Sequence, residues 1–292
     1  MTDSPAPAAR PVVLVTGAAG QLGSAFVTDL SDAYEVVGET RQTLDVTDHA
    51  AVMQRVRNLS PAVIVNCTAY NSVDGAEDDP VTALSVNAFA VRSLARAACE
   101  SGALLVHYST DFVFSGDTDR PYTEDDRPAP QSVYAQSKLV GEWMAADAPR
   151  HYVLRVESLF GGPHGRSSID RIIHALRTGA DAKVFSDRYV SPSFVGDVVA
   201  ATRALLRSEP APGMYHCVNS GFGTWLEVGQ EIARQLGNHS GRLVPVLTSD
   251  VKLKAKRPRF AALESARLAQ HGIGLPDWQD AVRRYLASLP TG

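Results

Sequence analysis

The sequence predicts an α/β fold with a doubly wound parallel sheet, and three observations support this prediction. Short apolar runs alternate with stretches of helical periodicity over the first half of the chain, as expected for parallel strands that helices cover on both faces. A glycine-rich turn separates the first apolar run from the first helical stretch. The 292 residues are 45% hydrophobic and 21% charged, which is typical of a globular protein with one large domain or two unequal ones.

The alternation of strands and helices starts at residue 12. Apolar, mostly β-branched runs predict strands at 12–15, 34–38, 62–67, 104–109 and 151–156. Apolar residues at helical spacing, such as Leu22, Phe26 and Leu30, predict helices at 21–30, 49–59, 81–101 and 132–145. Five strands with helices between them predict a sheet whose strands all run parallel.

The alternation weakens after about Leu159, which predicts a second, smaller lobe. Helices are expected at 168–178, 194–207, 225–236 and 277–288, and a strand at 214–219. We therefore expect residues 11–156 to form the larger domain, with 192–219 returning to it. Residues 157–191 and 220–292 are expected to form a discontinuous C-terminal lobe.

Composition excludes several classes of function. The chain has 28 basic and 32 acidic residues and a net charge of -4, which gives no reason to expect a nucleic-acid or anionic-membrane partner. No apolar run approaches the ~18 to 20 residues of a membrane span, and the first ten residues lack the apolar centre of a signal peptide. A cytoplasmic protein is expected. Three scattered Cys and no His-x-x-x-His pairing predict no metal site.

The glycine turn at 17–23 (Gly-Ala-Ala-Gly-Gln-Leu-Gly) predicts a dinucleotide site. A tight turn between strand and helix needs positive φ, and the helix N-terminus offers free N–H groups to a pyrophosphate. The alternative is a purely structural turn, but the position after the first strand favours a Rossmann domain. The expected contacts are Gly17, Gly20, Gln21, Leu22 and Gly23.

The adenosine end of the cofactor should lie about 20 residues further on, at Glu39 and Arg41. A lone acid would favour the ribose hydroxyl of NAD, whereas Arg41 could pair with the 2′-phosphate of NADP. We expect NADP, with NAD as the alternative. Asp45 and Val46 are expected beside the adenine, and Cys67, Thr68, Ala69 and Tyr70 at the end of the third strand.

A candidate reaction centre is formed by Tyr134 and Lys138, which lie four positions apart on one face of a predicted helix. Lys138 is the first lysine of the chain. A nearby ammonium is expected to lower the phenol pKa from about 10 and make Tyr134 a usable proton donor to a carbonyl. Thr110, at the end of the fourth strand, could hold the same oxygen. The alternatives are a surface Tyr–Lys pair and a Thr that satisfies a strand end.

These motifs resemble those of a known group of proteins. The glycine turn, 66–74 with Glu77 and Asn87, 108–116 and 134–138 are similar to segments of the extended short-chain dehydrogenase/reductases, and more narrowly of the dTDP-4-dehydrorhamnose reductase family. The resemblance extends to Arg155, 187–193 and 257–258, so it spans nearly the whole chain. It implies that Thr110, Tyr134 and Lys138 are catalytic and that Asn87 and Ser109, with Tyr134 and Lys138, join the cofactor contacts.

Two segments on the substrate side depart from the family pattern. The family carries a Trp shortly after the Arg that closes the fifth strand, whereas residues 155–160 here read Arg-Val-Glu-Ser-Leu-Phe. The family segment Asp-Gln-x-Gly-x-Pro-Thr appears here as Asp-Arg-Tyr-Val-Ser-Pro-Ser. A different sugar is therefore expected. The expected substrate contacts are Asp111, Val113, Glu157, Ser158, Arg188, Tyr189 and Arg257.

The leading hypothesis is NAD(P)H-dependent reduction of the 4-keto group of a nucleotide-linked, dTDP-type 4-keto-6-deoxysugar. Arg257 and Arg259 could neutralise the diphosphate, although a solvated basic stretch at 252–259 is an equal alternative. Two other functions stay open: a non-catalytic dinucleotide-binding subunit, like the regulatory subunit of methionine adenosyltransferase, and a nucleotide-sugar epimerase. A homodimer is also left open.

Overall fold

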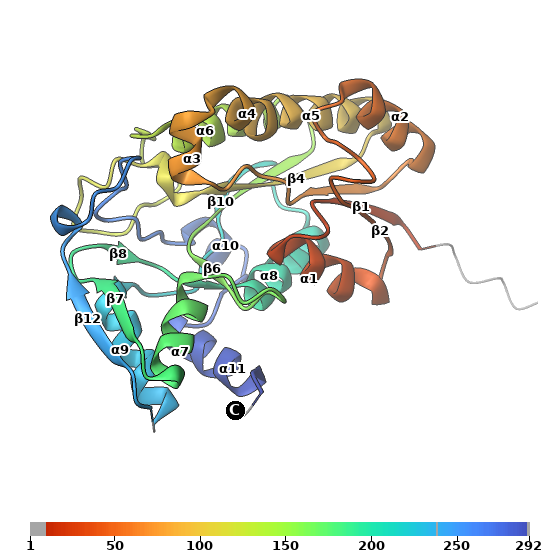
Figure 1. Cartoon of the computed structure of the whole chain (residues 1–292). Helices are drawn as coiled ribbons and strands as arrows, with labels where there is room; N and C mark the ends of the chain where they lie inside the picture. Colours follow the sequence, from red (N-terminus) through yellow and green to blue (C-terminus); the bar gives the residue numbers. More distant parts are fainter. Residues whose placement is uncertain (1–9, 238, 291–292) are drawn as a thin grey trace, which may run out of the picture.

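The computed structural model, which describes residues 10–237 and 239–290, confirms the doubly wound parallel sheet (Figure 1). All neighbouring strands of its six-stranded sheet are parallel. The expectation that the first ten residues are not a signal peptide concerns a segment of which residues 1–9 lie outside the described part of the chain. In spatial order the strands are β2 (Glu35–Glu39), β1 (Val12–Thr16), β3 (Val63–Asn66), β4 (Leu104–Thr110), β5 (His151–Val156) and β10 (Gly213–His216).

The strand order reverses between β1 and β3, and this reversal positions the site. β1 pairs with both β2 and β3. The chain runs from β1 to β2 on one side and then crosses back to β3 on the other side. In open α/β sheets ligands bind in the crevice at the carboxyl ends of the strands beside such a reversal. The side chain of Thr16 donates to Asn66 Oδ1 at 2.9 Å and joins the two strand ends there.

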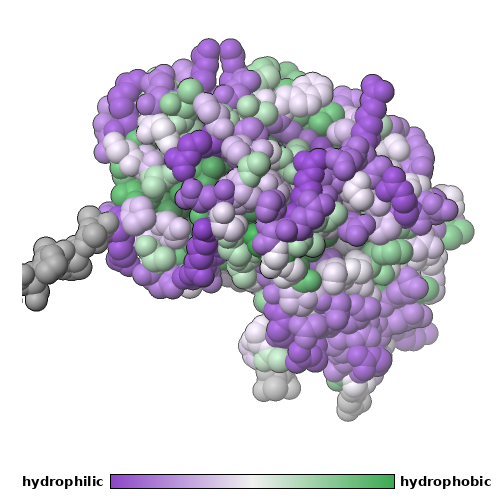
Figure 2. All heavy atoms as spheres, turned by 180° about the vertical axis from the view of Figure 1, so that it is seen from behind, coloured by the Kyte–Doolittle hydropathy of each residue, from purple (hydrophilic) through white to green (hydrophobic). Residues whose placement is uncertain are grey.

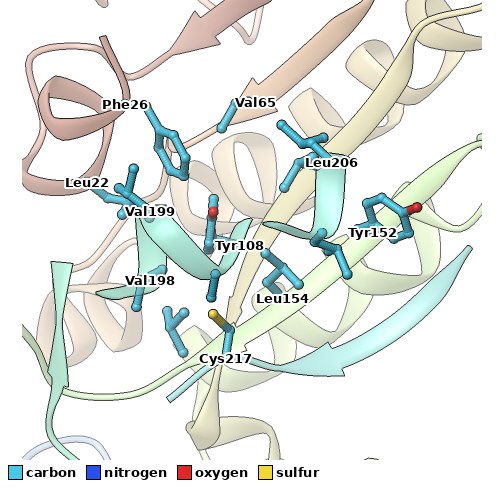
Figure 3. Close-up of a cluster of buried hydrophobic side chains, with 14 of the residues drawn as sticks. Leu22, Phe26, Val65, Tyr108, Tyr152, Leu154, Val198, Val199, Leu206 and Cys217 are labelled. Carbon is cyan, nitrogen blue, oxygen red and sulfur yellow. The ribbon is translucent and has the colours of Figure 1, made fainter. Parts of the chain in front are cut away.

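Helices cover both faces of the sheet (Figure 1). One face carries α2 (His49–Leu59), α4 (Pro80–Leu84), α5 (Ala90–Ser101) and α6 (Val133–Ala145), and the other carries α1 (Gln21–Asp29) and α8 (Val195–Ser208). The second face encloses a core in which Phe26, Tyr108, Leu154 and Cys217 meet between the strands and these helices (Figure 3). Short helices complete this part: α3 (Val73–Asp78) and the 3-10 turns Leu30–Asp32 and Asp111–Val113.

The chain is helical throughout the expected range 81–101, but a π-helical segment, Ser85–Phe89, lies between α4 and α5. A π-helical turn adds a residue to the helix and redirects the side chains around it, and such turns are frequent at functional sites. Here it carries Asn87. Helix α6 packs so tightly on this segment that a Cβ at Gly141 would lie 2.1 Å from the Asn87 carbonyl oxygen.

The smaller lobe contains a strand pair that the sequence did not predict, β7 (Asp181–Phe185) and β12 (Arg242–Val246). The side chains of β7 alternate between exposed and buried, and β12 contains Pro245, so neither segment is a continuous apolar run. The lobe has its own apolar core. The remaining elements of the second half of the chain are α7 (Ser168–Thr178), α9 (Trp225–Leu236), α11 (Trp278–Ser288), the 3-10 turn Thr248–Asp250, and the strand pairs β6 (Leu159–Phe160) with β9 (Ser193–Phe194) and β8 (Tyr189–Val190) with β11 (Gly223–Thr224). Helix α10 (Ala266–Gln270) packs against the core of the large sheet through Leu268.

The surface seen from behind is mixed in character (Figure 2). Hydrophilic residues dominate the narrower lower part in this view, and hydrophobic residues are interspersed with polar ones above it. Among residues 10–237 and 239–290, no helix has the length and apolar character that crossing a membrane requires.

Candidate active site

The glycine turn lies at the carboxyl end of β1, where positions 17 and 23 have no room for a side chain. Gly17 has φ 71°, and a Cβ on it would come within 2.9 Å of the Cys67 backbone. A Cβ on Gly23 would lie 2.3 Å from the Gly17 carbonyl oxygen. Gly20 begins α1 without a side-chain cap, so the first N–H groups of the helix point toward the crevice without a capping acceptor.

Two unpaired polar atoms beside this turn fit a bound dinucleotide. Within the described residues, Gln21 Nε2 and Thr68 Oγ1 are buried and have no hydrogen-bond partner. Buried polar groups are almost always paired, so such atoms at a crevice indicate groups that a ligand satisfies. Gly162 packs directly against Gln21, since a Cβ there would lie 1.9 Å from Gln21 Cγ. Together with the bare N-terminus of α1, these atoms suit the pyrophosphate and ribose hydroxyls.

At the adenosine end, the structure pairs Glu39 with an arginine that the sequence analysis missed. Arg55 on α2 donates from Nε to Glu39 Oε1 at 2.6 Å, and Glu39 is buried. Arg41 is exposed nearby. The pKa of Asp45 is lowered, mainly by hydrogen bonds from Thr47 and to a small extent by Arg41. Val46 turns its side chain into the hydrophobic core, so only its backbone can face a cofactor.

The structure brings the three predicted catalytic residues together at the carboxyl end of β4. Thr110 ends the strand, and Tyr134 and Lys138 lie one turn apart on α6. All three side chains are buried. Ser132 caps α6 by accepting the N–H of Ala135, which fixes where the helix begins and thus where Tyr134 stands.

The expected effect of Lys138 on Tyr134 is wrong for this structure. Burial raises the pKa of Tyr134 well above its usual value, and a hydrogen bond with the Thr110 side chain opposes the shift only in part. Lys138 instead donates from Nζ to the Tyr108 carbonyl oxygen at 2.6 Å. Burial lowers the pKa of Lys138 to about 8, although Glu142 acts in the opposite direction. The phenol is therefore a neutral proton donor in the absence of ligands.

Glu142 is a further residue that the sequence analysis did not single out. It lies one turn beyond Lys138 on α6, accepts from Ser109 Oγ at 2.6 Å, and forms a buried ion pair with Arg155 at 2.7 Å. These contacts tie α6 to the ends of β4 and β5. The spacing of four residues between Lys138 and Glu142 could have indicated that the two share one helix face. Nothing in the sequence indicated that Arg155 on β5 pairs with Glu142.

Asn87 links the cofactor side of the sheet to the helix that carries Tyr134. Its amide accepts from Tyr70 N at 2.8 Å and donates to the Tyr70 carbonyl and to Ser137 Oγ. Removing this side chain would leave buried backbone groups of Tyr70 unpaired. The two predicted cofactor residues Tyr70 and Asn87 thus lie in direct contact.

A cavity of about 600 Å³ opens beside the reaction centre, between the sheet and the smaller lobe. Its lining includes Asp111, Phe112, Ser158, Arg188 and Arg257 on the side of the reaction centre. The lining also includes five residues that were not among the expected substrate contacts: Arg171, Ile172, Lys183, Phe185 and Trp225. The cavity combines cationic and apolar side chains, as a site for a nucleotide-linked sugar would.

Three ionisable side chains are buried near this cavity, and two of them, Asp111 and Arg188, line it. Asp111 accepts from Thr110 Oγ1 at 2.9 Å, and burial raises its pKa. Burial and the neighbouring Asp111 raise the pKa of Glu157, whose Oε2 accepts from Ser191 N at 2.7 Å. Arg188 lies close enough to lower the pKa of both carboxyl groups.

Other predicted substrate residues lie elsewhere or are already paired. Val113 is fully buried in an apolar cluster, so its side chain does not face the cavity. Tyr189 stacks on Phe260 with ring centroids 5.0 Å apart. Arg257 lines the cavity and forms a two-pronged ion pair with Asp74 at 2.9 and 2.8 Å. Arg259 donates to the Thr118 carbonyl oxygen and does not line the cavity.

The parallel sheet, the glycine turn and the Thr110–Tyr134–Lys138 arrangement define the class of extended short-chain dehydrogenase/reductases. Residues 11–290 match the family described as RmlD substrate binding domain. The chain belongs to this family.

Individual relatives agree along the whole chain. A "Probable dTDP-4,6-dihydroxy-2-methyloxan-3-one 4-ketoreductase" of Streptomyces antibioticus is 37% identical, over 92% of this chain and 92% of its own length. A dTDP-4-dehydrorhamnose reductase of Streptomyces griseus is 35% identical, over 97% of this chain and 95% of its own. The crystal structure of the dTDP-4-dehydrorhamnose reductase of Bacillus anthracis in complex with NADP superposes with a TM-score of 0.91 at 30% identity, covering 96% of this chain and all of that one (100%).

Proposed function

We propose that this chain is an NAD(P)H-dependent oxidoreductase that reduces the 4-keto group of a nucleotide-linked, dTDP-type 4-keto-6-deoxysugar. The observation that carries the proposal is that Thr110, Tyr134 and Lys138 are buried together, and that Asp111 and Phe112, which directly follow Thr110, line a cavity of about 600 Å³. Relatives over the full length with reductase names, and a similar structure with NADP, support it.

The residues around the cavity suit this reaction step by step. The bound nicotinamide cofactor supplies a hydride for the carbonyl carbon. The Thr110 hydroxyl, which donates to Asp111 in the absence of ligands, turns its hydrogen to the carbonyl oxygen, and the neutral phenol of Tyr134 gives that oxygen its proton. The phenolate left behind is stabilised electrostatically by Lys138 and regains a proton from solvent. The substrate gains two hydrogens in total, one as hydride and one as proton.

The test is reduction of a panel of nucleotide 4-ketosugars, followed by loss of NADPH absorbance. Tyr134→Phe should lower turnover about 100- to 10,000-fold while NADPH binding survives, because only the proton donor is removed. Tyr215→Phe is the matched control, since Tyr215 donates to Ala211 O away from the cavity. Wild-type turnover by Tyr134→Phe would remove Tyr134 from the reaction. Failure of the wild type to bind any nucleotide sugar, with NADPH still bound, would favour the regulatory-subunit alternative.

The two departures from the family pattern support a different choice of sugar. Ser158 and Arg188 line the cavity in segments where the family has a Trp and a Gln. We expect poor activity on dTDP-4-dehydrorhamnose and better activity on another nucleotide 4-ketosugar. Efficient reduction of dTDP-4-dehydrorhamnose would contradict this. A cytoplasmic location, a homodimer and the boundaries of the two lobes stay predictions.

A further inference from the structure

Arg188 is held rigidly at the cavity wall. Its side chain is 7% exposed, and its guanidinium lies over the Phe185 ring, 5.2 Å from the centroid. Its carbonyl oxygen accepts the N–H of Trp225 at 3.1 Å, which anchors the backbone to the start of α9. A stacked, anchored arginine of this kind presents its N–H groups in a fixed direction.

The surroundings of Arg188 are unusual for a buried charge. Burial and the neighbouring Arg257 lower its pKa, while Asp111, Glu157 and Asp187 act in the opposite direction. Of these acids, Asp187 accepts two hydrogen bonds from Thr248 N and one from Thr248 Oγ1. Within the described residues, neither Arg188 Nε nor Glu157 Oε1 has a hydrogen-bond partner. An unpaired buried charge costs free energy unless a ligand completes its contacts.

Asp111 connects this arginine to the reaction centre. Thr110 donates to Asp111 Oδ1 at 2.9 Å, so the carboxyl group lies one hydrogen bond away from the hydroxyl that holds the reacting oxygen. Asp111 and Arg188 both line the cavity. Glu157 does not line it and is held from behind by Ser191 N at 2.7 Å.

We propose that Arg188 and Asp111 form a subsite for a hydroxyl group on the sugar carbon next to the reacting carbonyl. The inference rests on the proposed function. It names the feature of the sugar that this chain selects, through a residue in which it differs from the family pattern.

A hydroxyl group fits this pair better than other substituents do. It can donate to the Asp111 carboxyl group and accept from the Arg188 guanidinium at the same time. An ammonium group would be repelled by the Arg188 guanidinium. A carboxylate would be repelled by the carboxyl groups of Asp111 and, behind it, Glu157. A methylene at this carbon would leave both protein groups desolvated and unpaired, which is the situation in which enzymes discriminate most strongly.

The experiment compares two nucleotide 4-ketosugars that differ only in this hydroxyl group. Wild-type kcat/KM should favour the hydroxylated sugar at least about 100-fold. Arg188→Leu should bring this ratio to within about tenfold of unity, mainly by loss of activity on the hydroxylated sugar. Arg188→Gln keeps an N–H donor on a shorter side chain, so it should retain part of the discrimination. Arg203→Leu is the matched control, because Arg203 is a half-buried arginine on α8 that pairs with Asp29 and Asp32.

The outcomes are separable from those of the proposed function. An unchanged ratio in Arg188→Leu, with NADPH still stabilising the variant, overturns the subsite. If Arg188→Leu does not fold, Arg188→Gln decides, and an unchanged ratio there has the same meaning. If the wild type reduces neither sugar, the proposed function fails, and binding of the two sugars to the NADPH complex tests the subsite alone. If the NADPH complex then bound both sugars with equal affinity, or bound neither, the proposed subsite would be overturned.

Discussion

Burial, more than neighbouring charge, sets the protonation of the side chains at the reaction centre. It raises the pKa of Tyr134 and Asp111 and lowers that of Lys138. In each case the charged form is the one that loses hydration. The site without ligands therefore holds a neutral phenol and a carboxyl group that titrates near neutral pH.

The pH dependence of stability should report this perturbed Asp111. Its pKa is raised from 3.8 to about 7, so the folded protein keeps a proton that the unfolded chain has already lost. The stability due to this proton is complete below about pH 4 and is lost as the pH rises to 7. Asp111→Asn should therefore melt several degrees above the wild type at pH 8 and at the same temperature near pH 4, in thermal denaturation without ligand. Asp117→Asn, at an exposed site, is the control, and an equal offset at both pH values would contradict the assignment.

Cofactor choice should depend on two arginines. Arg41→Ala should weaken NADPH binding about tenfold or more and leave NADH nearly unchanged, because a hydrogen bond to a charged group contributes about 1.5 to 3 kcal/mol. Arg55→Leu should act in the same direction, since it exposes the 2′-phosphate to a Glu39 carboxylate that Arg55 otherwise pairs at 2.6 Å. Titration of both cofactors measures this. Equal losses for NADPH and NADH would show that neither arginine reads the phosphate.

At the scale of elements, the ends of strands and the starts of helices build the site. The turn after β1 and the N-terminus of α1 supply backbone groups, while β4 and α6 supply side chains. The π-helical segment Ser85–Phe89 links the segment after β3 to α6, because Asn87 bonds to Tyr70 on one side and to Ser137 on the other.

Gly20 and Gly23 of the turn should respond differently to substitution. Gly20→Val should leave the protein folded but abolish the stabilisation by cofactor, which is ~2.7 kcal/mol at 100 times the dissociation constant. Gly23→Ala should destabilise the protein even without cofactor, because its Cβ would lie 2.3 Å from Gly17 O. Gly274→Ala, where a Cβ meets nothing within 4 Å, is the control. Full cofactor stabilisation of Gly20→Val in a thermal-shift titration would contradict a pyrophosphate at this turn.

At the scale of the whole molecule, the smaller lobe closes one side of a cavity whose other side is the sheet edge. It contributes Arg171, Lys183 and Trp225, from three different elements. Under the proposed function the nicotinamide and the sugar meet at Thr110 and Tyr134, and we expect the nucleotide part of the substrate to extend toward this lobe.

Lys183 on β7 should therefore affect substrate binding and not cofactor binding. Lys183→Ala should raise KM for the nucleotide sugar about tenfold, because it removes one cation from the wall of the cavity, and should leave the dissociation constant of NADPH unchanged. Lys252→Ala, an exposed lysine that does not line the cavity, is the control. A parallel weakening of NADPH, or no change in KM, would show that the diphosphate does not lie there.

The sequence by itself determined the parallel sheet, the glycine turn and the Tyr134–Lys138 face of one helix. These features follow from local periodicity and from the rule that parallel strands end at one edge, so neighbouring residues suffice to predict them. The tertiary structure alone decided the pairing of β7 with β12, the buried Glu142–Arg155 ion pair, and the cluster of Asp111, Glu157 and Arg188. Each of these joins residues that are far apart in the chain. Their burial and their charges depend on which surfaces pack together, and no local pattern encodes that.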